Sequence, residues 1–160
     1  MLNVCYYDSP IGMLRILENE KGITGIQFAF DSKERINIIE ASTFLLKEAI
    51  RQLTDFFSSK LTVFTLPLDL QGTDFQLRTW NALRNIPYGE TRTYKQIAEA
   101  IDCPKGFRAV GHANNRNPIP IVIPCHRVIG ANGCLTGYSG GLDIKEKLLA
   151  IENFGNAKNN

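Results

Sequence analysis

Turn-forming residues divide the first part of the chain into short apolar runs. These runs predict three strands, over residues 2–8, 12–19 and 23–30. The connections Ser9–Gly12 and Asn19–Gly22 carry the Gly, Pro, Asn and Ser residues that tight turns favour. Because both connections are short, we expect the strands to form an antiparallel meander.

A helical pattern follows the predicted strands. Apolar residues recur at intervals of three and four between residues 36 and 57, and Ser32 precedes them as a candidate cap. Residues 63–70 return to extended structure, which Pro67 interrupts. Residues 1–70 contain no cluster of Cys, His and acidic residues and no Gly-rich loop, so we interpret them as a scaffold lobe.

The next part of the chain is mainly helical. Thr73 is a candidate N-cap for an amphipathic helix that ends near Pro87, and Thr93 is one for a short helix over 94–101. A further helix is expected over 107–116, after a turn that contains Pro and Gly. Two short helices joined in this way are typical of a helix-turn-helix, although plain helical hairpins share the pattern.

The stretch over residues 121–130 sets three polar residues among apolar β-formers. Cys125, His126 and Arg127 must find partners there, because an unpaired buried polar group costs about 1–3 kcal/mol. Pro124 removes a backbone donor, so the incoming strand should end or bend before Cys125. Such a bend would bring Cys125 and His126 to one site, where the thiol can become a nucleophilic thiolate. A small buried cysteine without a chemical role fits the same residues.

Glycine residues make the segment after this stretch a loop, and a final helix follows. Asp143 is the expected cap of that helix. Glu152 is expected near its end, where the helix dipole disfavours a carboxylate by about 0.3–1 kcal/mol. It is therefore either a surface residue or held by a partner such as His126. Residues 157–160 are expected to form a disordered tail, which leaves residues 71–156 as the second lobe.

The composition is that of an ordinary soluble protein. The 160 residues are 44% hydrophobic and 21% charged. No apolar run reaches the ~18 residues that a membrane span needs. The first residues lack the pattern of a secretory signal, so we expect a cytoplasmic protein whose four cysteines are free thiols. No C-x-x-C pair occurs and only two histidines are present, which argues against a zinc site.

Charge is distributed unevenly along the chain. The net charge is +2, but residues 71–130 carry eight Lys and Arg against four Asp and Glu, whereas residues 1–70 carry seven against nine. A local positive patch suits a polyanion, although surface charge of this size usually serves only solvation.

Four short motifs in the second lobe match one known family. They are Ile86-Pro87-Tyr88-Gly89-Glu90-Thr91 with Tyr94, Arg108-Ala109-Val110-Gly111, Asn117-Pro118-Ile119-Pro120 followed by Pro124-Cys125-His126-Arg127-Val128, and Tyr138-Ser139-Gly140-Gly141. With them the chain resembles the O6-alkylguanine-DNA alkyltransferases, densely over residues 73–154 and loosely before. The resemblance implies an α/β amino-terminal lobe of antiparallel strands and a helix, followed by a mainly helical carboxy-terminal lobe with a helix-turn-helix.

The resemblance also implies a DNA repair protein. Such a protein transfers a methyl or other small alkyl group from O6 of guanine, and from O4 of thymine, irreversibly to its own cysteine, once per molecule. The implied partner is double-stranded DNA that contains alkylated guanine. We expect a monomer that has no cofactor and does not associate with a membrane. A zinc site of the family in the first lobe is not carried over, because Cys5 has no obvious companions there.

By position in the family motifs, Cys125 would be the acceptor, and His126 would act on it through a water while Glu152 orients the imidazole. Asn117 would hold the chain around the cysteine, and Tyr94 would meet the guanine N3 as the leaving base gains a proton. These roles suit the chemistry, because an alkyl carbon on an ether oxygen is a poor electrophile and needs a thiolate to attack it.

The same resemblance implies a set of substrate contacts: Arg108, Pro120, Val128, Tyr138 and Ser139. Arg108 would fill the stack that the flipped nucleotide leaves. Tyr138 would wall the base pocket, and Ser139 would face O6. The carbonyl groups of Val128 and Cys125 would accept from the exocyclic amine, and the size of the alkyl group accepted would depend on the chain around Pro120.

Some features of the chain leave other interpretations open. Bulky or polar groups stand on the expected recognition helix where the family commonly has smaller or basic residues; they are Phe107, His112, Asn114 and Asn115. A sensor that binds alkylated DNA without reacting is disfavoured by the presence of Cys125. A cysteine hydrolase is disfavoured because no motif for an oxyanion hole occurs. A transcription regulator that senses methylation is disfavoured by the small first lobe.

Overall fold

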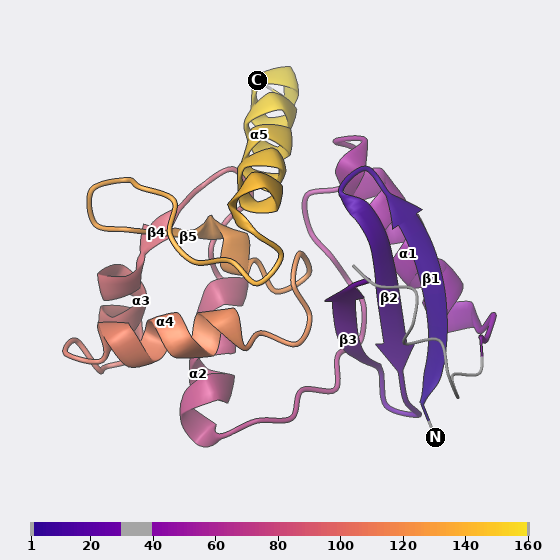
Figure 1. Cartoon of the computed structure of the whole chain (residues 1–160), viewed down its shortest axis with the longest axis horizontal. Helices are drawn as coiled ribbons and strands as arrows, with labels where there is room; N and C mark the ends of the chain where they lie inside the picture. The colour runs from indigo at the N-terminus through magenta and orange to yellow at the C-terminus, as the bar shows by residue number, and fades with distance from the viewer. Residues whose placement is uncertain (1, 30–39, 160) are drawn as a thin grey trace. The chain divides into compact units, whose positions relative to one another are not determined.

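The computed structural model describes residues 2–29 and 40–159 of the chain. The chain divides into two compact units, residues 1–70 and 71–160 (Figure 1). The first unit combines an antiparallel sheet with a helix, and the second is mainly helical. The fold class expected from the sequence is therefore confirmed.

The sheet of the first unit is the expected meander, with strand order β1-β2-β3. Its strands are β1 (Asn3–Ser9), β2 (Gly12–Glu18) and β3 (Ile23–Phe28). In the first turn, Ser9 Oγ donates to the Gly12 carbonyl oxygen at 2.6 Å. Gly12 has φ +107°, a conformation that glycine adopts without strain. Residue 30, the end of the third predicted strand, lies outside the described residues.

Helix α1 (Phe44–Phe57) packs on this sheet and buries an apolar face. It begins at Phe44, not at residue 36 as the periodicity predicted. Thr43 Oγ1 caps it by accepting from the Leu46 N–H at 3.1 Å. The segment just before the cap follows β1, because the Ala41 N–H donates to the Val4 carbonyl at 2.8 Å. Residues 36–39 and the candidate cap Ser32 lie outside the described residues.

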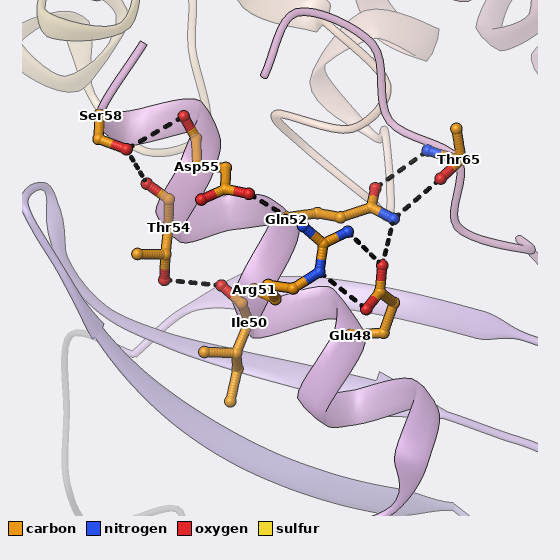
Figure 2. Close-up of polar contacts among 8 residues, drawn as sticks. All are labelled: Glu48, Ile50, Arg51, Gln52, Thr54, Asp55, Ser58 and Thr65. Atoms are coloured by element: carbon orange, nitrogen blue, oxygen red, sulfur yellow. Dashed lines mark hydrogen bonds and ion pairs between the residues drawn. The ribbon is translucent and has the colours of Figure 1, made fainter. Parts of the chain in front are cut away.

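Polar side chains of α1 serve two purposes (Figure 2). On the exposed face, Arg51 lies between Glu48 and Asp55, at 2.6 and 2.9 Å. Gln52 is buried instead, and its amide accepts from the Thr65 N–H at 3.0 Å and donates to Thr65 Oγ1 at 2.9 Å. Gln52 therefore fixes the chain that leaves the helix.

The segment over residues 63–70 forms no strand of its own, in contrast to the extended structure predicted there. Leu68 makes a single bridge to Ile23. The Pro67 carbonyl accepts from the Ile23 N–H at 2.9 Å, and the Asp69 N–H donates to the Ile23 carbonyl at 2.9 Å. The chain is thus held beside β3 at one point only.

The second unit begins with three helices that pack against one another (Figure 1). They are α2 (Asp74–Arg84), α3 (Tyr94–Ala100) and α4 (Phe107–Asn115). Thr73 and Thr93 cap α2 and α3 as predicted, each in a capping box with a Gln three residues later. The helix-turn-helix expected over 94–116 is therefore present as α3 and α4.

The stretch before Cys125 turns back on itself and is not a strand. The Ile123 N–H donates to the Ile119 carbonyl at 2.9 Å, and Ile121 has φ +75°. A positive φ is rare for a β-branched residue, so local propensity points to the wrong structure here. The predicted break at Pro124 is present, and a 3₁₀ helix, η2 (Cys125–Arg127), follows it. Val128–Ile129 then forms β5, parallel to β4 (Arg92–Thr93).

The final helix, α5 (Leu142–Asn159), is longer at both ends than predicted. Asp143 lies in its first turn and is not its cap, because the helix starts at Leu142 after Gly141, which has φ +97°. The backbone stays helical to Asn159, so a disordered tail over residues 157–160 is not observed for the described residues. Polar residues at a chain end do not by themselves stop a helix, whose ladder needs only backbone groups. Among the described residues, no helix is both long and apolar enough to cross a membrane.

Candidate active site

Cys125 is the first residue of η2, and 2% of its surface is exposed. The Arg127 N–H donates to the Pro124 carbonyl at 3.0 Å, which closes the 3₁₀ turn. With three residues per turn, neighbouring side chains point about 120° apart and not to opposite faces as on a strand. The turn therefore allows Cys125 and its neighbour to serve one site.

His126 is completely buried, and its Nε2 lies 2.8 Å from Glu152 Oε1 on α5. Burial lowers the pKa of His126, against the opposing effect of the Glu152 carboxylate. The imidazole is therefore neutral, with Nε2–H donating to Glu152. Nδ1 then carries the lone pair that can receive a proton.

Glu152 is buried in the middle of α5, so the helix-end argument made from the sequence is wrong. Arg127 Nε donates to both of its oxygens, at 2.9 and 3.1 Å, and Arg127 Nη2 donates to Oε1 at 2.6 Å. Arg127 Nη1 also donates to the Ile86 carbonyl at 2.7 Å. Burial raises the pKa of Glu152, but its bonds and charge contacts with His126 and Arg127 outweigh that effect and lower it. Glu152 is thus a buried carboxylate. Of the two interpretations that the sequence left open, the structure agrees with the one in which a partner holds Glu152.

Burial raises the pKa of the Cys125 thiol to about 11. The Asn117 amide, the charge of Lys145 and the Tyr138 hydroxyl act in the opposite direction without overcoming it. Cys125 is therefore a thiol at neutral pH, and a reaction that uses its thiolate must remove the proton as it proceeds.

Side-chain amides support the turn that carries Cys125. Asn117 Nδ2 donates to the Ile123 carbonyl at 2.7 Å, and Asn117 Oδ1 accepts from the Ile119 N–H at 3.0 Å. Asn114 Nδ2, from the buried face of α4, donates to the Cys125 carbonyl at 3.3 Å. Helix α4 therefore contacts the backbone of the cysteine directly.

Tyr94 begins α3, and its hydroxyl group meets the loop over residues 130–141. The Tyr94 hydroxyl donates to the Thr136 carbonyl at 3.2 Å and accepts from Thr136 Oγ1 at 3.3 Å. Lys145 Nζ, from α5, donates to the Val128 carbonyl at 2.6 Å and to the Thr136 carbonyl at 2.8 Å. These contacts link α3, α5 and the start of β5 to the loop over residues 130–141.

Two family models match the chain. Residues 74–154 match the DNA binding domain of 6-O-methylguanine DNA methyltransferase, and residues 4–70 match its ribonuclease-like domain. The chain belongs to the 6-O-methylguanine DNA methyltransferase family.

Relatives with known sequences or structures match this chain along nearly its whole length. A protein of Methanosarcina barkeri named methylated-DNA--protein-cysteine methyltransferase is 56% identical in an alignment of 154 residues that covers 92% of this chain and 96% of that protein. The crystal structure of Mycobacterium tuberculosis OGT in complex with DNA matches with a TM-score of 0.88 and 45% identity, over 96% of this chain and 94% of that one. O6-methylguanine-DNA methyltransferase from Pyrococcus kodakaraensis matches with a TM-score of 0.58 and 27% identity, over 95% and 99%.

Residues expected from the methyltransferase motifs fall into two groups in the structure. Most are buried or half-buried around the turn and the loop: Cys125, His126, Glu152, Asn117, Tyr94, Pro120, Val128 and Tyr138. Arg108, the second residue of α4, and Ser139, in the loop, are exposed. Both exposed residues lie where a ligand can reach them from solvent.

Three residues at the candidate site were not singled out in these positions from the sequence: Lys145, Asn114 as a support of the cysteine, and Arg127 as the partner of Glu152. A signal existed for Arg127, since a charged residue inside an apolar run needs a buried partner. None existed for Lys145, whose bonds go to backbone carbonyl groups. Such acceptors are present at every residue, so no side-chain pattern marks them.

Proposed function

We propose that this chain is a DNA repair protein that transfers a methyl or other small alkyl group from O6 of guanine in double-stranded DNA to Cys125. One observation carries the proposal: a buried thiol precedes an imidazole that is hydrogen-bonded to a buried carboxylate, in the motif where the family has its acceptor. The name of the Methanosarcina barkeri relative, methylated-DNA--protein-cysteine methyltransferase, supports the same activity. O4 of thymine is the second expected substrate.

The transfer needs a proton acceptor beside the thiol. Neutral His126 takes the Cys125 proton through a water, and Glu152 stabilises the imidazolium that results. Arg127 keeps Glu152 charged and fixes its orientation. Because burial keeps Cys125 protonated at rest, the thiolate forms only when His126 removes the proton.

The sulfur then attacks the alkyl carbon. The S–C bond forms while the C–O6 bond breaks, and the bonding electrons stay with the guanine. The departing base takes up one proton at N3 from the Tyr94 hydroxyl, and the proton held by the His126 imidazolium then returns to Tyr94 through water. The thiol and the alkylated base thus become a thioether and unmodified guanine. A thioether carbon is a poor electrophile, so each molecule reacts once.

The substrate atom lies inside the duplex, so the nucleotide must leave the stack. We assign the reading of the duplex to α3 and α4, with α4 as the recognition helix and Arg108 at its exposed start. The excess of Lys and Arg in residues 71–130 supports binding to phosphates. Double-stranded DNA with alkylated guanine is the partner in this proposal.

We place the protein in the cytoplasm as a monomer. All four cysteines are free thiols in the structure, as is usual in a reducing compartment. The residues proposed to react come from one chain, so a second copy is not needed to complete the site.

A series of lesions tests the proposed activity. Duplexes that contain O6-methylguanine or O4-methylthymine should lose their methyl group to an equimolar amount of protein. N7-methylguanine should keep its methyl group, because N7 does not occupy the position of O6 against Cys125. Loss of methyl groups from all three duplexes at one rate, or from none of them, would contradict the proposal.

Arg108→Ala is expected to slow methyl transfer from duplex DNA about tenfold to a hundredfold while leaving transfer from the free modified base unchanged. Arg108 fills the gap in the stack, which offsets unstacking worth a few kcal/mol, and ~1.4 kcal/mol corresponds to a factor of ten. Single-turnover rates on both substrates measure the difference.

Arg116→Ala provides the matched control for Arg108, because Arg116 is an exposed arginine at the other end of α4. The loss of transfer rate in the Arg116 variant should be smaller than in the Arg108 variant, and it should fade as the salt concentration rises, as for a phosphate contact. Equal losses in the Arg108 variant on duplex and on free base would show that Arg108 supports the pocket and not the stack.

A further inference from the structure

Asn114 is a buried asparagine near the end of α4, and 2% of its surface is exposed. Its Nδ2 donates to the Cys125 carbonyl at 3.3 Å. Its Oδ1 is buried as well and has no hydrogen-bond partner among residues 2–29 and 40–159. Burying an amide oxygen without a donor is costly, so such an atom beside a reactive cysteine points to a donor on the ligand.

The carbonyl oxygen of Cys125 already accepts from two donors. Besides Asn114 Nδ2, the Val128 N–H donates to it at the end of η2. A carbonyl oxygen has two lone pairs, so a third donor would have to displace one of these two. The Cys125 carbonyl is thus poorly placed to accept from the exocyclic amine of guanine, the role that the family resemblance implies for it.

The Val128 carbonyl is the other acceptor that the resemblance implies for the amine. It can take only one of the two amine hydrogens, because Lys145 Nζ also donates to it, at 2.6 Å. The second hydrogen therefore needs another acceptor. Asn114 Oδ1 belongs to the amide that is bound to the Cys125 carbonyl, so it lies next to the position implied for the amine.

We propose that Asn114 determines the preference for guanine by binding its 2-amino group. Asn114 Oδ1 accepts one amine hydrogen while Nδ2 stays bound to the Cys125 carbonyl, and the Val128 carbonyl accepts the other hydrogen. This inference rests on the proposed function. Helix α4 then serves the reaction at both ends, with Arg108 at its exposed start and Asn114 at its buried end.

A base without the amine tests the proposal. O6-methylhypoxanthine differs from O6-methylguanine only by a hydrogen in place of the 2-amino group. We expect wild-type protein to take the methyl group from duplex O6-methylguanine about tenfold to a hundredfold faster in single turnover, because two buried acceptors lose their donor in the other duplex. This ratio of rates is the preference for guanine.

Asn114→Leu keeps a similar side-chain volume without a donor or an acceptor. We expect its preference for guanine to be about tenfold smaller than that of the wild type. A purely structural role would slow transfer from both lesions alike and leave the ratio unchanged. The same two duplexes are used with every protein, so any difference in how easily their bases leave the stack cancels in the comparison.

Asn115→Leu is the matched control, since Asn115 is an exposed asparagine that follows Asn114 on the same helix. A change in duplex binding there would affect both lesions alike, so the preference for guanine should keep its wild-type value. Asn114→Ala decides the matter if the leucine variant does not fold, and its preference should be reduced in the same way.

Equal losses on both lesions in the Asn114 variants would overturn the proposal and leave Asn114 as a support of the turn that carries Cys125. Equal rates on the two lesions in the wild-type protein would overturn it as well. Failure of the proposed function is distinguishable from these results, because the wild-type protein would then take a methyl group from neither lesion.

Discussion

Cys125→Ala protein is expected to transfer no methyl group and to bind duplex DNA with unchanged affinity. The substitution removes the attacking sulfur and nothing that reaches the DNA backbone, since Cys125 is buried in η2. Transfer is measured with a labelled methyl group on duplex O6-methylguanine, and binding with the unmodified duplex. Cys125→Ser should fail as well, because an alcohol near its normal pKa is a far weaker nucleophile than a thiolate.

Cys134→Ala is the control for this prediction. Cys134 is an exposed thiol in the loop over residues 130–141, so its loss should leave the rate of transfer unchanged. Residual label on the Cys125→Ala protein, or loss of transfer in the Cys134 variant alone, would show that Cys125 is not the acceptor.

Glu152→Gln is expected to slow methyl transfer about a hundredfold, through loss of the stabilised imidazolium. It should also lower the free energy of unfolding by about 3–5 kcal/mol, because it leaves the buried Arg127 guanidinium without its counter-charge. The Arg127 contacts make stability and transfer fall together. Transfer rates and urea unfolding at pH 7 measure the two losses.

The pH dependence of stability gives Glu152 a second test. Its pKa is lowered in the folded protein, so the stabilisation is present above the unfolded pKa of about 4.3 and is lost as the pH falls through the folded value. As the pH falls, His126 lowers the stability before Glu152 does. Because its pKa is lowered in the folded protein, the unfolded chain binds more protons below about pH 6.5, which destabilises the fold.

The fall in stability at low pH that Glu152 contributes, its acid limb, should be absent from the Glu152→Gln variant. Glu146→Gln, at an exposed position of the same helix, should change neither the transfer rate nor the acid limb. Identical losses in the two variants would show that the charge of α5, and not the buried ion pair, matters.

Helix starts that depend on neighbouring residues in the sequence were predicted well. Thr73 and Thr93 each stand three residues before a Gln, and both form the reciprocal bonds that this spacing allows. The meander of the first unit was predictable for the same reason, since its turns carry their own chemistry in Ser9 and Asn19.

Structure that depends on particular side-chain or backbone bonds outside the regular helix and turn patterns was predicted less well. Ile121–Ile123 has the composition of a strand, but Asn117 binds the Ile123 carbonyl and turns the chain. Helix α1 begins late because its approach pairs with β1. In both cases a specific hydrogen bond outweighs a propensity worth a few tenths of a kcal/mol per residue, about the usual size of such preferences.

The candidate site was predictable where chemistry depends on side-chain type. Cys125, His126 and Glu152 could be named from the motif, and the structure brings the last two to 2.8 Å. The roles of the individual residues stay predictions. Lys145 could not be named, because carbonyl groups that only the folded chain brings together make its environment.

The mass of the protein after reaction with duplex O6-methylguanine shows whether Cys125 is the acceptor of the methyl group. We expect a gain of one methyl group per molecule, found after proteolysis on the peptide that contains Cys125. A second equivalent of substrate should add nothing, because the thioether does not react again. No gain in mass, or a methyl group on a peptide without Cys125, would contradict this assignment.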